Sequence, residues 1–408
     1  MADKKTKKKK SKWIKKRHNI VQNVAYCLLY PYYKLKFGVT PRPFKEENGR
    51  QYLVLYNHQT SADMFFVGMC FKKPLYYVAT EDIFSLGWIS KLLSFLVAPI
   101  PIKKQANDVR AVLNCMKVVK EGGSICLAPE GNRTYSGETA YFKESIVGLA
   151  RALKLPIAIC KIEGGYGVQP RWTDKVRRGK MTAGVTSVIE YDTYKDLGDS
   201  ELYSLIGSEL YVNENSADGI FKSNRRAEYI ERVLYVCPDC GLSEFESCGN
   251  EFACKKCGLT VEYGEDKRLR AKKGSIPFEF IGDWYNYQCD FINDLDVLSY
   301  TGEPIYTETA MFSEEIPYEK KVVIDEAARV YLFGDKIKIV MENEERVHAF
   351  DEIRVMTVLG RNKLNFYLGE RVFQLKGSER FNAVKFMNIY FRYKNIREEN
   401  GNVKFLGI

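Results

Sequence analysis

Short apolar runs alternate with amphipathic segments through the first half of the chain. The runs hold five to eight residues and predict buried strands at 52–56, 74–79, 98–102, 124–128 and 155–162. Helical periodicity occupies the intervals at 63–70, 87–95, 107–120 and 145–153. This alternation favours an α/β domain with a mostly parallel sheet that is covered on both faces.

The pattern becomes β-rich near the end of the chain. Seven short apolar runs are separated by turn residues such as Gly360 and Gly369, and they lie at 321–324, 329–333, 336–341, 346–350, 353–359, 363–368 and 371–375. An amphipathic helix is expected over 380–392. Seven strands followed by one helix resemble a pleckstrin-homology-like (PH-like) sandwich.

The formal charge of +10 is concentrated at the N-terminus, because residues 1–18 hold ten Lys or Arg and one Asp. A basic tail suits nucleic acid or an anionic membrane surface, or it is solvated and has no partner. Apolar residues at helical spacing over 13–35, flanked by basic residues, predict an amphipathic helix. Such a helix lies in the lipid interface or packs on the protein's own core.

No segment reads as a membrane span or a secretory signal. The most apolar window, 83–102, has Lys91 in its middle and Pro99 and Pro101 near its end, which disfavours a span. We expect a buried helix there, or an apolar face that touches lipid. Polar residues interrupt the first apolar stretch and no cleavage pattern follows, so we expect the chain to keep its N-terminus.

Four of the eleven cysteines form a metal-type array. Cys237, Cys240, Cys254 and Cys257 have the spacing C-x2-C-x13-C-x2-C, and Gly241 and Gly258 follow the two pairs. Two C-x-x-C turns supply the four thiolates of a closed tetrahedral site, so we expect a structural Zn²⁺. The other cysteines lack framework spacing, as expected of reduced thiols.

One of only three histidines opens a candidate catalytic pair in the stretch L-Y-N-H-Q-T-S-A-D, residues 55–63. If a strand ends at Tyr56 and a helix begins near Ala62, His58 lies in the turn and Asp63 in the first helical turn. The two side chains can then converge. Asp63 would hold one ring nitrogen and make His58 a general base.

A second stretch, S-I-C-L-A-P-E-G-N-R, ends the strand predicted at 124–128. Its glycine, Gly131, permits close approach of the backbone, and Arg133 offers a fork of donors that suits phosphate. Together, N-H-x-x-x-x-D and P-E-G-x-R resemble the signatures of the PlsC-like glycerolipid acyltransferase family. The similarity covers about residues 45–210, and the bacterial 1-acyl-sn-glycerol-3-phosphate acyltransferases are the most similar members.

The resemblance implies a fatty acyl transfer from acyl-CoA or acyl carrier protein to the sn-2 hydroxyl of lysophosphatidic acid, which makes phosphatidic acid. It implies that His58 and Asp63 are catalytic and that Glu130, Gly131, Asn132 and Arg133 bind the acceptor. Lys104 stands where the family has a phosphate-binding arginine, and Asn132 stands where threonine is common. These departures affect which acceptor the enzyme would use. Another lysophospholipid or glycerol 3-phosphate is therefore the alternative acceptor.

With this resemblance the chain divides into five expected parts. They are a basic tail and membrane-interface helix (1–40), a glycerophosphate-acyltransferase-like α/β domain (41–230), a zinc ribbon (231–265), a linker or helical connector (266–318) and a β-rich PH-like domain (319–408). We expect a peripheral protein on the cytoplasmic face of the membrane. A zinc-ribbon nucleic-acid-binding protein is the alternative of another class, but the ribbon's acidic interior disfavours it, so no nucleic acid is expected.

Overall fold

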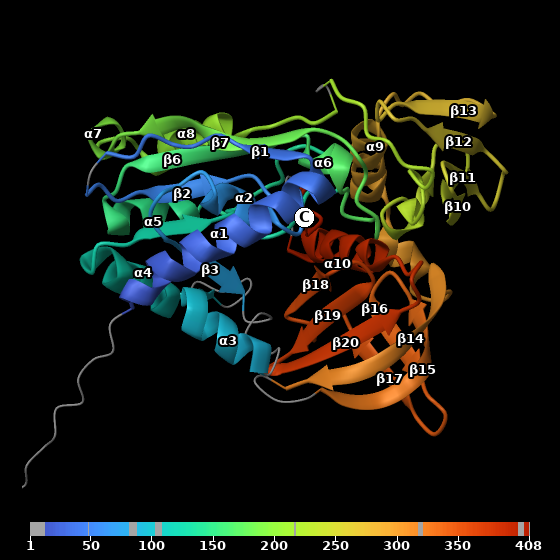
Figure 1. Cartoon of the computed structure of the whole chain (residues 1–408). Coiled ribbons are helices and arrows are strands. Elements are labelled where there is room, and N and C mark those ends of the chain that lie inside the picture. The colour runs from blue at the N-terminus through green and yellow to red at the C-terminus, as the bar shows by residue number, and fades with distance from the viewer. Residues whose placement is uncertain are drawn as a thin grey trace, which may run out of the picture.

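The structure of this protein is a computed structural model. It describes residues 13–47, 49–80, 88–102, 108–215, 218–316, 321–398 and 404–407. An α/β part, a four-cysteine part and a β-rich part follow one another along the chain (Figure 1). Most of the basic tail and Lys104 lie outside the described residues.

The α/β part is built on a seven-stranded sheet with the order β1-β7-β6-β2-β5-β3-β4. Its strands are β1 (Val39–Pro41), β2 (Leu53–Tyr56), β3 (Leu75–Thr80), β4 (Ile100–Ile102), β5 (Ser124–Leu127), β6 (Ile157–Glu163) and β7 (Met181–Ile189). Only the β6–β7 pairing is antiparallel among the described pairings of this sheet. The predicted mostly parallel α/β sheet is confirmed, although the apolar runs did not reveal β1 or β7.

Helices cover both faces of this sheet, which explains the unbroken apolar strands. The helices are α1 (Lys16–Phe37), α2 (Asp63–Gly68), α3 (Trp88–Val97), α4 (Val109–Lys120), α5 (Ser145–Leu153), α6 (Gly165–Val168), α7 (Tyr191–Tyr194) and α8 (Asp199–Leu210). Leu53 and Leu55 of β2 share one core with α4, α5 and α8. Val54 and Tyr56 point the other way, into a core with α1 and α2. Strand β2 therefore lies at the centre of two apolar layers.

The four-cysteine part is a group of short antiparallel strands. Strands β8 (Val236–Cys237) and β9 (Gly241–Leu242) form a pair, and a second sheet has the order β10 (Phe245–Cys248), β11 (Glu251–Cys254), β12 (Thr260–Tyr263) and β13 (Leu269–Lys273). A 3-10 turn, η2 (Ile230–Arg232), precedes them, and α9 (Ile281–Asp294) and η3 (Val297–Tyr300) follow. The buried Trp284 of α9 packs on Phe245 and Phe252 of the second sheet.

The C-terminal part is a half-barrel of seven antiparallel strands with the order β17-β16-β15-β14-β20-β19-β18. The strands are β14 (Tyr306–Glu315), β15 (Val322–Leu332), β16 (Lys336–Val340), β17 (Glu345–Ala349), β18 (Val355–Leu359), β19 (Lys363–Leu368) and β20 (Arg371–Gly377). Helix α10 (Ala383–Arg397) follows, and the Asn382 side chain caps it by accepting from two backbone N–H groups.

The break predicted between two of the C-terminal strands is wrong. The runs at 321–324 and 329–333 belong to one long strand, β15, because the polar residues between them continue the ladder instead of forming a turn. The missing seventh strand, β14, lies inside the stretch 266–318 that we expected to be a connector. Its sequence, Y-T-E-T-A-M-F-S-E-E, alternates poorly, and its pairing with β15 shifts register beside Phe312.

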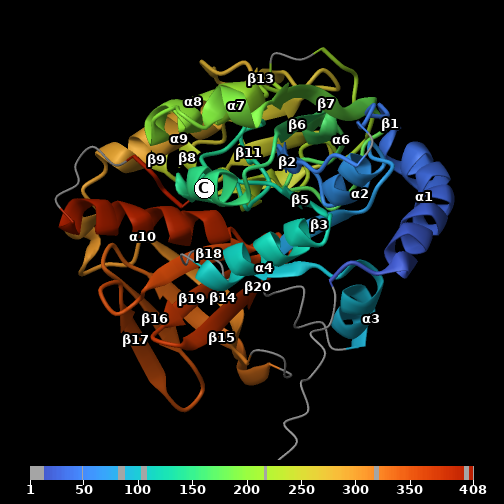
Figure 2. The same cartoon turned by 90° about the vertical axis from the view of Figure 1, so that its left-hand side faces the viewer.

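The C-terminal half-barrel is packed firmly against the rest of the chain. One apolar core extends from Trp172, after α6, through Trp284 to Tyr390 of α10. The Tyr235 hydroxyl donates to Asn388 Oδ1 at 2.7 Å, which joins the four-cysteine part to α10. Helix α10 lies between the α/β layers and the strands of the half-barrel (Figure 2).

Helix α1 packs on the α/β part through one side and is open on another. Its buried His18 contacts the Tyr76 hydroxyl at 2.9 Å, and Gln22 donates to the carbonyl of Phe71 at 3.1 Å. Arg17 lies over the ring of Phe95, which joins α1 to α3. Among the described residues, no helix combines the length and the apolar character that a membrane crossing requires.

Candidate active site

The turn between β2 and α2 brings His58 and Asp63 together. Nδ1 of His58 lies 2.8 Å from Oδ2 of Asp63. The Asp63 side chain is fully buried, whereas the His58 side chain is 23% exposed. With the carboxylate as acceptor, Nδ1 carries the proton, and the lone pair of Nε2 is available for a proton from a substrate.

The local chain wraps around the Asp63 carboxylate. The N–H groups of Gln59 and Thr60 donate to Oδ2 at 2.6 and 2.9 Å, and the Thr60 hydroxyl donates to Oδ1 at 2.5 Å. Buried charges require such donors, and several of them fix the orientation of the carboxylate. Asp63 therefore has one arrangement available, and His58 is oriented by it.

Asn57 holds the same turn against the sheet. Its side-chain amide donates to the carbonyl of Ile162 at 2.8 Å and accepts from the N–H of Ile162 at 2.7 Å. This pair of hydrogen bonds fixes the residue before His58 to β6. Asn57 was not among the predicted site residues.

Glu130, after β5, holds the backbone on both sides of the site. Its Oε1 accepts from the N–H of His58 at 2.8 Å, and its Oε2 accepts from the N–H of Ala140 at 2.7 Å. Burial raises the pKa of Glu130 to about 8 against these two donors. In this structure Glu130 positions His58, and the expected contact with the acceptor stays a prediction.

The rest of the P-E-G-N-R stretch forms a tight turn beside the histidine. Gly131 has φ +65°, a left-handed conformation that favours glycine, and no neighbouring atom crowds it. The N–H of Thr134 donates to the carbonyl of His58 at 3.0 Å. The two sequence motifs are therefore neighbours in space, as their family resemblance implied.

Arg133 has a polar atom without a protein partner. Its Nη1 is buried and makes no hydrogen bond. Burial and, to a smaller extent, the nearby Arg171 lower the pKa of Arg133 to about 10, whereas Asp63 acts in the opposite direction. A buried guanidinium N–H without an acceptor is costly, and an anionic ligand would satisfy it.

Arg171 is a site residue that the sequence analysis missed. It is 4% exposed, its Nη1 donates to the carbonyl of Arg133 at 2.8 Å, and its Nη2 lies 3.5 Å from Asn132 Oδ1. The guanidinium also lies over the Tyr135 ring at 4.2 Å. Nothing in its surrounding sequence, Q-P-R-W-T, forms a motif, so only the fold places it beside Arg133.

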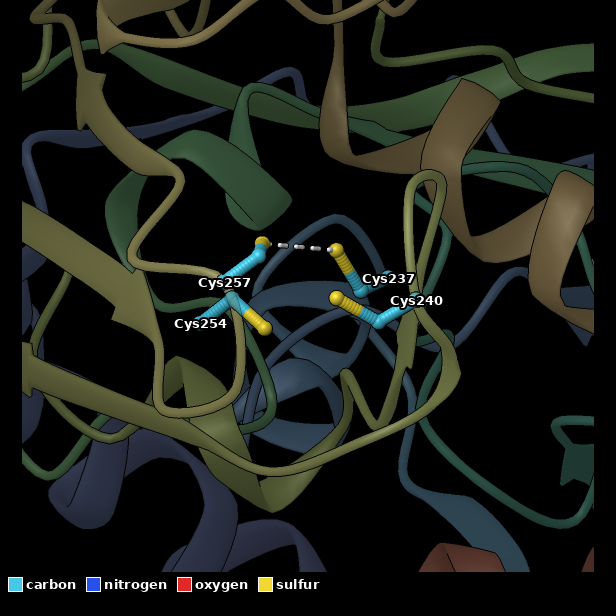
Figure 3. A group of neighbouring side chains, drawn as sticks. All are labelled: Cys237, Cys240, Cys254 and Cys257. Carbon is cyan, nitrogen blue, oxygen red and sulfur yellow. Dashed lines mark hydrogen bonds between the residues drawn. The ribbon is translucent and has the colours of Figure 1, made fainter.

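The four cysteines of the metal-type array come together in space. Their Sγ atoms all lie within 4.8 Å of one another, and those of Cys237 and Cys257 are 3.7 Å apart. Figure 3 shows the four thiols pointing toward a common centre. Two sulfurs on one tetrahedral zinc are about 3.8 Å apart, given a Zn–S bond of about 2.3 Å. The residues therefore fit one metal ion, and zinc as its identity stays a prediction.

The segment that contains this candidate site is similar to a known protein family. Residues 40–163 match the protein-family model described as Acyltransferase. The matched segment includes the His58–Asp63 pair and Arg133. Residues 40–163 are thus similar to an acyltransferase domain, which indicates an enzyme.

Individual relatives are distant. The chain is 24% identical over 166 residues to 1-acyl-sn-glycerol-3-phosphate acyltransferase BAT2, chloroplastic, of Brassica napus, with coverage of 39% of this chain and 46% of that protein. It is 30% identical over 155 residues to the 1-acyl-sn-glycerol-3-phosphate acyltransferase of Saccharomyces cerevisiae, with coverage of 35% and 48%. The chain spans less than half the length of the curated relatives it matches.

A solved structure is similar over part of the chain. It is the 1-acyl-sn-glycerophosphate acyltransferase PlsC from Thermotoga maritima, with 18% identity and a TM-score of 0.38. The alignment covers 48% of this chain and 76% of that chain.

Substitution of Glu130 by Gln should displace His58. A glutamine retains one oxygen, and its NH₂ group would face one of the two backbone N–H donors. We expect the free energy of unfolding to fall by about 1–3 kcal/mol and kcat to fall by up to about 100-fold. Denaturant unfolding and steady-state kinetics measure the two effects. Glu144→Gln, at an exposed position, is the control, and equal behaviour of the two variants would contradict the assigned role.

The raised pKa of Glu130 also predicts a pH dependence. Its pKa in the folded protein is about 8 and its ordinary value is 4.5, so the folded protein holds the proton more tightly. This carboxyl stabilises the fold fully below pH about 4.5 and loses that contribution as the pH rises to about 8. The difference in unfolding free energy between wild type and Glu130→Gln should therefore decrease between pH about 5 and 8, as unfolding curves at several pH values would measure.

We expect the purified protein to contain one zinc ion per chain. Cys237→Ser should lose the ion and lower the unfolding temperature, because the metal joins the two cysteine turns. The exposed Cys248 lies outside the cluster, so Cys248→Ser is the matched control. Mass spectrometry for metals and thermal unfolding measure both. The prediction would be contradicted if the wild-type protein contained no metal, or if both variants lost metal and unfolding temperature to the same extent.

Proposed function

We propose that this protein is an O-acyltransferase of lipid synthesis. It transfers a fatty acyl group from acyl-CoA or acyl carrier protein to the sn-2 hydroxyl of lysophosphatidic acid, which makes phosphatidic acid. The observation that carries the proposal is the oriented His58–Asp63 pair next to the buried, unpartnered Nη1 of Arg133. The names of the distant relatives support the choice of acceptor.

The geometry supports a general-base mechanism. Nε2 of His58 takes the proton of the acceptor hydroxyl while the hydroxyl oxygen attacks the thioester carbonyl. Backbone N–H groups near the turn hold the oxyanion of the tetrahedral intermediate. A C–O bond forms, the C–S bond breaks, and the leaving thiolate takes the proton from His58. Asp63 keeps the imidazole in one orientation and stabilises its charged form, as the buried contact at 2.8 Å favours.

Arg133 is the proposed ligand of the acceptor's phosphate. The buried Nη1 of Arg133 has no hydrogen-bond partner in the protein, and an oxygen of the bound phosphate would supply one. Asn132 and Gly131 shape the turn that presents it. Lys104 would add a positive charge to the same head group, as proposed from the family resemblance.

The exposed apolar faces of α1 and α3 favour a peripheral position on an anionic membrane. Ile20, Val24, Leu28 and Leu35 of α1 are 54–88% exposed, and Trp88, Leu92 and Phe95 of α3 are 43–73% exposed. The two helices contact each other through Arg17 and Phe95. Basic side chains of α1, including Lys34 and Lys36, would face anionic head groups. We propose that the enzyme lies on the cytoplasmic face of the membrane, where it has access to a lysolipid in the bilayer.

The appended parts would be structural or adaptor modules. We propose zinc as the ion of the cysteine cluster, in a closed site that stabilises the fold. The strand order of the half-barrel and its final helix support a PH-like assignment.

Loss of His58 should abolish acyl transfer. We expect His58→Ala to lower the rate by about 10²-fold to 10⁴-fold, because general-base catalysis is lost. The assay follows thiol release from acyl-CoA and from acyl carrier protein, with lysophosphatidate, glycerol 3-phosphate or lysophosphatidylethanolamine as acceptor. His348→Asn, in the C-terminal half-barrel, is the matched control. Full activity of His58→Ala would disprove the mechanism, and thiol release without any acceptor would indicate a thioesterase instead.

Charged substitutions on α1 should weaken membrane binding. We expect Leu28→Glu combined with Leu35→Glu to reduce binding to anionic vesicles at least tenfold, because each exposed leucine contributes about 1.5–3 kcal/mol when buried in lipid. Vesicle flotation measures the bound fraction. Leu298→Glu is a control at another exposed leucine, and equal binding by all variants would refute the membrane face.

A further inference from the structure

Arginines from two parts of the chain gather beside the proposed acceptor site. Arg133 and Arg171 belong to the α/β part, whereas Arg361 belongs to the turn between β18 and β19 of the half-barrel. Nη1 of Arg361 lies 2.7 Å from Oδ1 of Asp174, in the segment after α6. The half-barrel thus reaches the α/β part with a charged side chain.

The turn that carries Arg361 is well anchored. Gly360 has φ +63°, the left-handed conformation that such a turn uses. The Asn362 side chain donates to the carbonyls of Gly377 and Ser378, each at 3.0 Å. These contacts hold the residue after Arg361, so the Arg361 side chain starts from a defined position on the half-barrel.

Asp174 is shared between two guanidiniums. Arg232, which is 3% exposed, contacts Oδ1 of Asp174 at 2.6 Å, and Arg361 contacts the same oxygen. One carboxylate therefore faces two positive charges. The ion pair with Asp174 engages Nη1 of Arg361, and a guanidinium has five N–H donors in a planar fork. Arg361, whose side chain is 34% exposed, can thus bind a second anion.

A short series of contacts links Arg133 to Arg361. Nη1 of Arg171 donates to the carbonyl of Arg133 at 2.8 Å. Asp174 follows Arg171 by three residues and pairs with Arg361 at 2.7 Å. Arg133 also interacts electrostatically with Asp63, Arg171 and Arg361. These contacts place the unpartnered Nη1 of Arg133 and the Arg361 guanidinium in the same region of the molecule.

We propose that Arg361 of the C-terminal half-barrel completes the acceptor site, and that this site selects acceptors with a terminal phosphomonoester. The inference rests on the proposed acyltransferase function. A phosphomonoester carries a charge of about −1.5 to −2 at pH 7 and three acceptor oxygens, which suit Arg133 and Arg361 together. A zwitterionic head group would bring a cation toward the same guanidiniums, so the site disfavours it.

The test measures phosphate affinity separately from turnover. Isothermal titration of the full-length protein with sn-glycerol 3-phosphate, without acyl donor, gives the Kd of wild type, Arg361→Gln and Arg361→Lys. We expect Arg361→Gln to raise the Kd at least about tenfold, as loss of a charge-assisted hydrogen bond would. Arg361→Lys keeps the charge and should be intermediate. In acyl transfer, the KM for lysophosphatidate should rise by a similar factor while the KM for the acyl donor stays unchanged.

Two controls separate ligand binding from domain packing. Asp174→Asn breaks the ion pair with Arg361 but keeps the guanidinium, so phosphate affinity should stay equal or increase. Arg371→Gln removes another arginine of the half-barrel, which pairs with Glu314, and should leave the Kd unchanged. Equal losses in Arg361→Gln and Asp174→Asn would overturn the inference in favour of a purely structural ion pair.

The remaining outcomes distinguish this inference from the proposed function. No binding of glycerol 3-phosphate by wild type, or an Arg361→Gln variant equal to Arg371→Gln, would overturn the role of Arg361 even if acyl transfer occurs. Phosphate binding that depends on Arg361, without any acyl transfer, would support the site and refute the proposed reaction.

Discussion

A fully buried carboxylate, Asp63, determines the geometry of the candidate active site. A charge without water must collect donors, and the chain supplies them from the backbone of Gln59 and Thr60 and from the ring of His58. In the conformation that the structure shows, the turn gives donors to both oxygens of Asp63. His58 therefore presents Nε2 outward as a consequence of how the carboxylate is solvated by the protein.

The second motif depends on the same turn. Glu130 accepts from the N–H of His58, and Thr134 donates to its carbonyl. The histidine backbone is thus held on both its polar groups by the loop that also carries Arg133. The proposed base and the proposed phosphate ligand are thus fixed relative to each other, which suits an acceptor that carries its reacting hydroxyl and its phosphate on one small molecule.

The parts beyond the α/β domain are integrated with it. A single apolar core joins Trp172, Trp284 and Tyr390. Trp284 packs on strands of the four-cysteine part, so the cysteine cluster is attached to the same core. Such a core keeps the half-barrel from moving as a free module. This rigidity is what allows a residue as distant in sequence as Arg361 to lie beside Asp174.

The sequence by itself determined the local features of this protein. Apolar runs with both faces covered gave the central strands of the parallel sheet, cysteine spacing gave the cluster of four thiols, and the His-x4-Asp spacing across a strand-to-helix turn gave the contact at 2.8 Å. These features depend on neighbours within a few residues or on strand ends that share an edge. Strand β14 was not predicted, because its buried face depends on distant partners and not on a regular alternation of apolar and polar residues. Only the tertiary structure decided that Glu130 accepts from the backbone of His58, that Arg171 contacts Arg133 and that Arg361 contacts Asp174. Such contacts depend on long-range packing that no local pattern encodes.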